Sequence, residues 1–425
     1  MTGSKVKKPV PLPHLNSWRM HRQFLDHPFS SKSLLELIKS TGWIYSPGCS
    51  TPYLSLWARM TSFKAEDLNR LVFDDHKLVQ VETLRGCTML VPRDQANIAL
   101  RIRTRTFTEL TKQARQQMPI SDAEMEKLKT AILKTLHSGA RTTEQLQHAV
   151  PSNLVRDFGP DLKRIGLTNS LSLAINLLKE EGKLLKQQVK KRLDMMEYAF
   201  VLTSNMLPEA DPANLRMEEA CTQLAQQYFK AEAPARVKDF AWWAGINVTD
   251  AIRGAGEVKP KLVPIAVEGT ADEFLISESD VDALLSFQPQ ESAISFIPYR
   301  DTFLKGQREI VSRFVSSEHA DKPFSRWKGK LINDPLATVI LNGRVIGVWE
   351  WNEDDEEVDL LLFESNIPKP VEKTIHKRAA ELASFIRSHL GEVRLQGLDY
   401  GPHQMTGIHD LKVFWGKGAQ VDIRV

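Results

Sequence analysis

Residues 121–202 carry the most regular alternation of hydrophobic and polar positions in the chain. Ser121 and Glu124 have the spacing of a capping box, which predicts a helix start at this point. Farther on, Leu173, Leu177 and Leu178 fall on one face of another helix. The pattern predicts helices at 121–137, 144–149 and 169–181, followed by strands at 184–189 and 198–202. Three helices and then a β-ribbon is the order of a winged helix, whose third helix enters the DNA major groove.

The same order of elements recurs at 214–287, with little residue-level similarity between the two copies. Helices are expected at 218–230, 237–244 and 249–253, and a ribbon at 262–267 and 273–276. The preceding residues form a mixed unit in which Arg85-Gly86 joins two short strands. After residue 294, strands are expected at 337–341, 347–351 and 358–363, with Asn342-Gly343 as a type I′ hairpin signal. An amphipathic helix at 373–389 follows.

Composition places the chain among globular proteins. Its 425 residues are 42% hydrophobic and 26% charged, and the formal net charge is only +3. Local clustering of charge must therefore carry any argument for a nucleic-acid partner. The three cysteines lie far apart, which fits a reducing cytoplasm. No stretch approaches the ~18 apolar residues needed to span a bilayer, so the prediction is a cytoplasmic protein, associated with the nucleoid if bacterial.

The densest cluster of cations falls on the ribbon of the middle unit. Five cations occur within ten residues, before the first acid at Asp194: Lys183, Lys186, Lys190, Lys191 and Arg192. A wing beside a recognition helix is where phosphate contacts are wanted, because each neutralised phosphate releases counterions. The alternative is an ordinary solvated hairpin face. On a winged-helix ribbon we favour DNA contact.

Three further residues are candidate DNA contacts. Asn169 and Ser170 begin the third helix of the middle unit, where they can reach bases or phosphates or simply cap the helix. Arg85 lies between the two strands of the first unit. We expect no metal site and no cofactor, since the histidines near the C-terminus lack partners at ligand spacing and the common catalytic motifs are absent.

Several short strings resemble one family. Y-L-S-L-W-A-R at 53–59, L-R-G-C-T-M-L-V-P at 84–92, D-F-A-W-W-A-G at 239–245, I-P-Y-R-D at 297–301 and N-G-R-V-I-G-V-W at 342–349 occur in the chain. They are similar, in order, to segments of the AlkZ/YcaQ-like family of winged-helix DNA glycosylases. The resemblance implies three tandem winged helices and a C-terminal β-barrel-like element. It also implies monofunctional excision of alkylated or crosslinked purines from double-stranded DNA, without a cofactor.

At the family's catalytic motif the chain departs from the pattern. The resemblance implies a Gln-x-Gln, Gln-x-Asp or His-x-Gln pair shortly before the Y-L-x-L-W segment. Tyr45 and Pro47 occupy those two positions here, and residues 43–51 contain no Gln, Asp, Glu or His. A neutral phenol, with a reference pKa of about 10, is a poor general base at neutral pH. Asp301 is the candidate acid that substitutes for the missing pair.

The sequence thus predicts an α+β protein: three tandem winged helices plus a C-terminal β-barrel-like element with one helix. The expected parts are a disordered basic tail at 1–13, winged helices at 14–117, 118–207 and 212–290, and a β-rich domain at 291–425. The expected function is that of a monomeric DNA-binding protein resembling DNA glycosylases of DNA repair. The alternative is a catalytically inactive DNA-binding protein, such as a damage sensor or transcriptional regulator.

Overall fold

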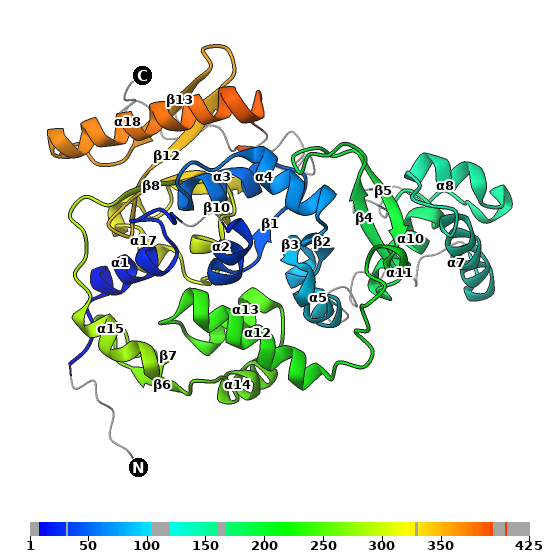
Figure 1. The fold of residues 1–425 in the computed structure, drawn as a ribbon, viewed down its shortest axis with the longest axis horizontal. Helices are drawn as coiled ribbons and strands as arrows, with labels where there is room; N and C mark the ends of the chain where they lie inside the picture. Colours follow the sequence, from blue (N-terminus) through cyan, green and yellow to red (C-terminus); the bar gives the residue numbers. More distant parts are fainter. Residues whose placement is uncertain are drawn as a thin grey trace.

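A computed structural model describes residues 8–30, 33–103, 120–159, 163, 167–327, 330–393 and 404–405. Figure 1 shows a broad body with a small helical lobe at one end, formed by residues of the middle unit. None of the helices in these ranges is both long and apolar enough to cross a membrane.

The first unit contains a three-stranded antiparallel sheet in the order β1-β3-β2. Its strands are β1 (Ile44–Tyr45), β2 (Leu78–Glu82) and β3 (Thr88–Pro92). Its helices are α1 (Leu12–Arg22), α2 (Leu34–Thr41), α3 (Thr51–Arg59), α4 (Ala65–Asn69) and α5 (Ala96–Arg103), with a π-helical turn, Arg70–Asp74, after α4. The two strands expected around Arg85-Gly86 are confirmed, and the Y-L-S-L-W string forms α3.

The second unit has the predicted order of three helices and a ribbon. Its elements are α7 (Asp122–Leu136), α8 (Thr143–Ala149), α10 (Ser170–Glu180), β4 (Leu184–Gln188) and β5 (Tyr198–Leu202). Capping boxes begin all three helices, at Ser121, Thr142 and Asn169. The polar caps satisfy backbone N–H groups that would otherwise lack partners, which is why the helix starts could be predicted.

The third unit repeats three helices and a ribbon. Its elements are α11 (Thr203–Met206), α12 (Met217–Glu232), α13 (Val237–Ala244), α14 (Val248–Gly256), β6 (Leu262–Ile265), β7 (Phe274–Ser277) and α15 (Val281–Ser286). Gly245 ends α13 with a left-handed φ of 70°, as expected for a glycine after a helix.

The C-terminal part is an open four-stranded antiparallel sheet in the order β13-β12-β11-β8. Its strands are β8 (Ile294–Ile297), β11 (Thr338–Leu341), β12 (Arg344–Asn352) and β13 (Glu357–Leu362), and β9 (Phe324–Trp327) pairs with β10 (Lys330–Pro335) and β14 (Gln404–Met405). Two short helices, α16 (Thr302–Lys305) and α17 (Val311–Phe314), precede β9, and α18 (Lys369–Phe385) runs into a π-helical turn, Ile386–Leu390. Within these described strands no closed barrel forms. Asn342 and Gly343 have φ of 51° and 79°, which confirms the predicted hairpin turn.

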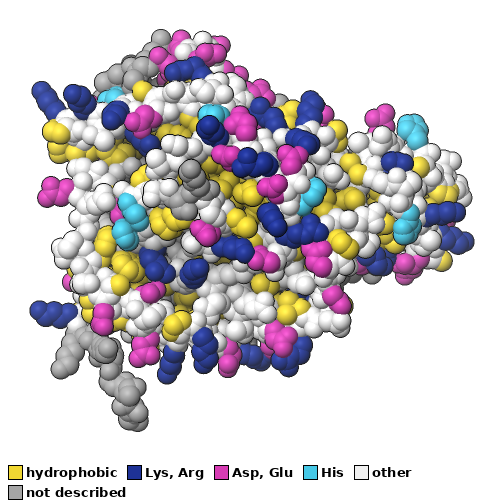
Figure 2. Space-filling view, viewed as in Figure 1, with side chains coloured by type: hydrophobic (Ala, Val, Ile, Leu, Met, Phe, Trp, Pro, Cys, Tyr) yellow, Lys and Arg dark blue, Asp and Glu magenta, His cyan; other side chains and the backbone are white. Residues whose placement is uncertain are grey.

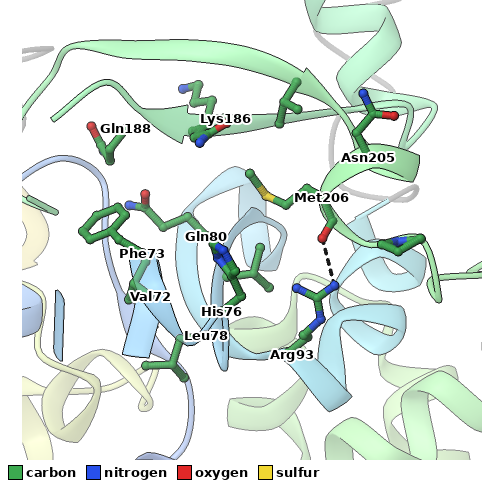
Figure 3. A pocket seen from close by; sticks show the side chains of 14 residues that line it. Val72, Phe73, His76, Leu78, Gln80, Arg93, Lys186, Gln188, Asn205 and Met206 are labelled. Atoms are coloured by element: carbon green, nitrogen blue, oxygen red, sulfur yellow. Dashed lines mark hydrogen bonds between the residues drawn. The ribbon is translucent and has the colours of Figure 1, made fainter. Parts of the chain in front are cut away.

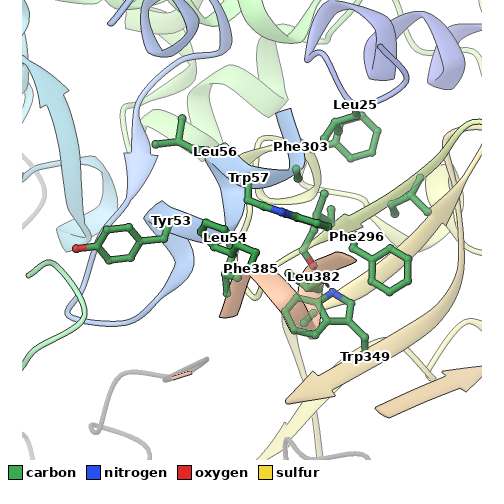
Figure 4. Packing of buried hydrophobic residues seen from close by; sticks show 14 of the residues in the cluster. Leu25, Tyr53, Leu54, Leu56, Trp57, Phe296, Phe303, Trp349, Leu382 and Phe385 are labelled. Carbon is green, nitrogen blue, oxygen red and sulfur yellow. Dashed lines mark hydrogen bonds between the residues drawn. The ribbon is translucent and has the colours of Figure 1, made fainter. Parts of the chain in front are cut away.

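The largest core joins the first unit to the C-terminal part. Helix α3 places Trp57 beside Phe385 of α18, and one buried cluster joins Tyr53 and Trp57 of this helix to Phe296 and Trp349 of the sheet (Figure 4). The apolar residues of the Y-L-S-L-W string are therefore core residues. They fix the loop between β1 and α3 against the sheet.

Helix α1 is enclosed by segments more than 200 residues away. Arg19 is fully buried, paired with Glu232, and its guanidinium lies 5.3 Å from the Phe303 ring. Asn16 donates to the Arg313 carbonyl at 2.6 Å. The hairpin at Gly343 sits so close that a Cβ there would lie 2.6 Å from the Asn16 Cβ. Only glycine fits this contact between the sheet and α1.

Candidate functional site

Segments from three parts of the chain line a cavity of about 330 Å³. Its lining residues are Tyr45, Leu84, Arg85, Cys87, Met89, Trp242, Trp243, Arg300, Thr302, Lys305 and Asp334. We call this the central pocket. It brings together the catalytic-motif position, the R-G-C-T-M turn, the W-W dipeptide and the I-P-Y-R-D segment.

The first unit's sheet positions Tyr45. The residue lies opposite Met89 in the β1–β3 pairing, so both side chains project from the same face. The next residue, Ser46, donates its backbone N–H to Thr88 and accepts a hydrogen bond from the Gln80 amide at 2.9 Å. The Tyr45 hydroxyl accepts a hydrogen bond from Arg300. The loop is thus held on both sides, and its phenol points at a cation.

Arg85 and Trp242 form the opposite wall. Arg85 occupies a left-handed conformation with φ of 52°, and its guanidinium lies 4.0 Å from the centre of the Trp242 ring. Lys305 approaches the same ring at 5.5 Å. An indole face with cations nearby suits an aromatic ring that is joined to an anionic group. This wall therefore fits a nucleotide.

Asp334 contributes the carboxylate of the central pocket. It accepts hydrogen bonds from the Tyr299 hydroxyl at 3.0 Å and from Arg300 Nε at 2.9 Å, and it pairs with Lys305 at 2.8 Å. Burial raises the pKa of Asp334, but Lys305 and Arg300 more than offset this and hold it below its usual value. The carboxylate is therefore ionised at neutral pH.

The other titratable groups of the pocket have a defined charge at neutral pH. Burial raises the pKa of the Tyr45 phenol despite the nearby Arg300, and burial also raises the pKa of the Cys87 thiol. Both groups therefore stay protonated. Burial lowers the pKa of Lys305, partly offset by Asp334. With Arg85, Arg300 and Lys305 against one carboxylate, the lining carries net positive charge.

Asp301, the acid expected to substitute for the missing pair, lies outside this pocket. Its side chain is buried and forms a bidentate pair with Arg59 of α3, at 2.6 and 2.8 Å. It also accepts from the Ser55 hydroxyl at 2.6 Å and caps α16 through the Phe303 N–H. Every oxygen has protein partners, so the residue joins α3 to α16. Its neighbour Arg300 is the one that reaches the pocket.

The predicted cations of the ribbon all face carboxylates within the protein. Lys183 pairs with Glu181 at 2.8 Å, Lys186 with Glu82 at 3.1 Å, Lys190 with Glu197 at 3.2 Å, Lys191 with Asp74, and Arg192 with Asp194 at 2.6 Å. The end of the ribbon is also anchored: Leu193 is buried and its N–H donates to Tyr53 at 2.9 Å. Figure 2 shows lysines and arginines interspersed with acids on the displayed face.

Asn169 and Ser170 serve the helix start. Asn169 accepts a hydrogen bond from the Ser172 N–H at 2.9 Å. It therefore caps the helix, which is one of the two roles considered for it from the sequence. Ser170 is fully buried, and its hydroxyl donates to the Leu154 carbonyl at 2.6 Å. Burial removes the Ser170 side chain from any contact with DNA in this conformation.

A second cavity, of about 400 Å³, separates the first unit from the ribbon of the second. Figure 3 shows Phe73, His76 and Gln80 on one side and Lys186 and Gln188 on the other. It lacks a carboxylate lining residue and shares none of its lining with the central pocket. The family-like strings converge on the central pocket instead.

Comparison with known proteins identifies the family to which the chain belongs. The sequence profile of the family described as DNA glycosylase AlkZ-like matches residues 39–385. The chain belongs to this family. The fold of this AlkZ-like protein is similar to that of the solved Streptomyces sahachiroi DNA glycosylase AlkZ, with a TM-score of 0.69 and 21% identity over 91% of this chain and 99% of that one. Among curated proteins, no match was found.

Two residues that the sequence marked as candidates, Tyr45 and Arg85, line the central pocket. Three other lining residues, Arg300, Lys305 and Asp334, were not among the candidates. Arg300 stands in a family-like string, beside the acid that was chosen. Asp334 follows a segment with no motif, and only the pairing of β9 with β10 brings it to the site.

Proposed function

We propose that this protein is a monofunctional DNA glycosylase of DNA repair that excises alkylated purines from double-stranded DNA in the central pocket. The observation that carries the proposal is the convergence of three family-like strings and the catalytic-motif position on one cationic, aromatic-lined cavity with an ionised carboxylate. Three winged-helix modules, at 14–117, 118–207 and 212–290, would arrange the DNA around it. The β-rich part at 291–425 would close the pocket through Arg300, Lys305 and Asp334.

The chemistry asks little of the protein, since an alkylated purine carries positive charge and is a good leaving group. The bond from sugar C1′ to the purine nitrogen breaks, and its electron pair neutralises the base. Water then adds to the oxocarbenium ion at C1′ and loses a proton to solvent. Asp334 would stabilise the developing positive charge, and a fixed charge in a partly buried site costs no reorganisation during the reaction.

The remaining residues would hold the nucleotide. Arg85 and Lys305 would contact phosphate oxygens, and Trp242 would stack on a base or sugar. Tyr45, protonated at neutral pH, would donate a hydrogen bond to the water or the sugar and would not act as a base. Substrate binding through the backbone implies little dependence on DNA sequence.

The test is excision from a duplex with one 7-methylguanine, with abasic sites detected by alkaline cleavage. We expect cleavage well above spontaneous depurination, and we expect Asp334→Asn to abolish it. Arg344→Ala is the matched control, because Arg344 is an exposed arginine paired with Glu364 and lies outside the pocket lining. Absence of cleavage at protein concentrations that saturate binding would mean that the pocket binds DNA without cutting this lesion.

A further inference from the structure

The turn after α1 gathers two histidines and a carboxylate. His21 lies in the last turn of α1, and a chain reversal at Phe24, with φ of 55°, returns Asp26 and His27 to it. Nδ1 of His21 lies 3.1 Å from one Asp26 oxygen, and Nδ1 of His27 is hydrogen-bonded to the other. One ligand atom from each residue lies within 4.8 Å of the others. Three donors thus converge within seven residues of sequence.

The three side chains are held in this arrangement by their neighbours. The Asp26 side chain is 3% exposed, whereas those of His21 and His27 are 40% and 38% exposed. The two imidazoles stack at 4.0 Å, and Phe287 and Phe24 pack against them at 5.0 and 5.3 Å. The packing keeps the three side chains close together, but one imidazole would have to rotate out of the stack for both nitrogen lone pairs, which lie in the ring planes, to point at one ion.

The donor set matches a particular class of cation. Two imidazole nitrogens and one carboxylate oxygen suit Zn²⁺ and its neighbours Ni²⁺ and Cu²⁺. Tetrahedral zinc, with ligands at about 2.0–2.1 Å, requires donors about 3.3 Å apart, which is close to the spacing around Asp26. The two histidines also border a cavity of about 510 Å³, which leaves room for a fourth, non-protein ligand.

The charges around the cluster permit a divalent cation. Arg22 and Lys230 also line this cavity. Arg22 pairs with Asp280 at 3.2 Å and donates to the Lys230 carbonyl, so much of its charge is compensated. Lys230 remains as a nearby cation, which lowers the expected affinity without removing the site.

We propose that His21, Asp26 and His27 bind one divalent transition-metal ion of the Zn²⁺ class. The site shares no lining residue with the central pocket and does not depend on glycosylase activity. The ion would stabilise the reversal after α1, where Trp18 packs edge-on against Phe287 at 5.4 Å.

The test measures binding of Zn²⁺ alone to the full chain by calorimetry, and of Co²⁺ by its visible absorption. We expect about one ion per chain and a Co²⁺ spectrum of tetrahedral nitrogen and oxygen ligation. His27→Gln and Asp26→Asn should each weaken binding at least tenfold, since even outer-shell losses cost 10–100-fold. The control is His148→Gln, which removes an exposed histidine from α8 and should leave binding unchanged.

Equal Zn²⁺ affinity in wild type and His27→Gln would overturn the proposal, as would a six-coordinate Co²⁺ spectrum in the wild type. Circular dichroism establishes that each variant is folded. If His27→Gln does not fold, the wild-type spectrum and the rise in wild-type melting temperature with Zn²⁺ concentration still decide the question, since an ion bound only by the native state must raise it.

Discussion

The central pocket and the ribbon of the second unit hold cations in different ways. In the pocket, Arg85, Arg300 and Lys305 come from separate segments and surround one carboxylate, so positive charge is in excess. On the ribbon, each lysine or arginine faces a carboxylate from the same unit or a neighbouring one. A run of cations along the sequence therefore does not predict a positive surface. By contrast, cations that the fold assembles around a single shared acid give a surface with net positive charge.

The ion pairs of the two regions also differ in how much they contribute to the stability of the fold. Pairs on the ribbon are mostly exposed, and such pairs contribute about 0–1 kcal/mol because water and salt screen them. Asp334 is 7% exposed, so its partners cannot be replaced by water without cost. The exposed ribbon pairs therefore contribute little to stability, whereas the charges of the pocket are held in place by burial.

Removing the shared acid gives the largest expected effect. Asp334→Asn leaves Arg300 and Lys305 without their carboxylate, and it should lower the free energy of unfolding by about 3 kcal/mol. Excision of 7-methylguanine should fall at least about 100-fold if the carboxylate stabilises the transition state. Urea denaturation and single-turnover cleavage measure the two effects. On the ribbon, Glu197→Gln should lower the free energy of unfolding by less than about 1 kcal/mol. Equal losses of stability from the two variants would show that the ion pairs of the pocket and of the ribbon do not differ in strength.

The stability contributed by Asp334 should depend on pH. Its folded-state pKa is held below the unfolded value of about 3.9. The contribution is therefore fully present above that value and is lost as pH falls through the folded-state pKa. The gap in unfolding free energy between wild type and Asp334→Asn should shrink as the pH is lowered from about 5 toward 2. A constant gap would mean that the carboxylate is not ionised in the folded protein.

Loss of the aromatic wall should weaken DNA binding next. Stacking on an aromatic side chain contributes about 1–3 kcal/mol per base, so Trp242→Ala should reduce affinity for lesion DNA by roughly 5–150-fold. Tyr198→Leu, which removes the ring 4.5 Å from Lys186 on the ribbon, is the matched variant and should have little effect. Fluorescence anisotropy with a labelled duplex measures the affinity of both variants. A larger loss of affinity from Tyr198→Leu would show that the ribbon, and not the central pocket, supplies the aromatic contact with DNA.

Salt dependence separates the two cation groups directly. Removing a cation that neutralises one DNA phosphate should flatten the slope of log affinity against log salt by about one unit. We expect Arg85→Ala to flatten this slope by about one unit. Joint replacement of Lys190, Lys191 and Arg192 with Ala should flatten the slope by less than about one unit in total, since these cations already have carboxylate partners. A decrease in slope near three units would show that the ribbon of the second unit is the main DNA contact, as the sequence predicted.

The smallest effect concerns the start of α10. Asn169→Ala removes an N-cap and should cost about 1 kcal/mol of stability, with no change in DNA affinity. Thermal unfolding and anisotropy test the two halves of this statement. A drop in affinity in a folded Asn169→Ala variant would show that the residue touches DNA as well as capping the helix.

Local signals in the sequence predict many of the helices and strands. Capping residues such as Ser121, hydrophobic spacing along α10 and the turn at Asn342-Gly343 each act over a few residues, so they can be recognised in the sequence. The family resemblance pointed to Tyr45 and Arg85, and both line the central pocket. What these signals could not show was that the apolar residues around Trp57 pack against the C-terminal sheet, because that packing spans more than 200 residues.

The site escaped prediction where it depends on long-range pairing. Asp301 and Arg300 are adjacent, and the sequence does not say which of them faces the pocket. The backbone decides: Arg300 has φ of 58°, which turns consecutive side chains to different sides. Asp334 has no local signal at all. Two of the carboxylates that face ribbon cations, Glu82 and Asp74, lie more than 100 residues away in sequence.

The enclosure of α1 has a consequence for how the chain is made. Its buried polar groups take partners from Glu232, Phe303, Arg313 and Asn342. On a ribosome, α1 is synthesised more than 200 residues before these partners, so Arg19 cannot be buried without loss until they follow. The helix therefore settles late relative to its synthesis, and a nascent chain stalled before the sheet would expose it to chaperones and proteases.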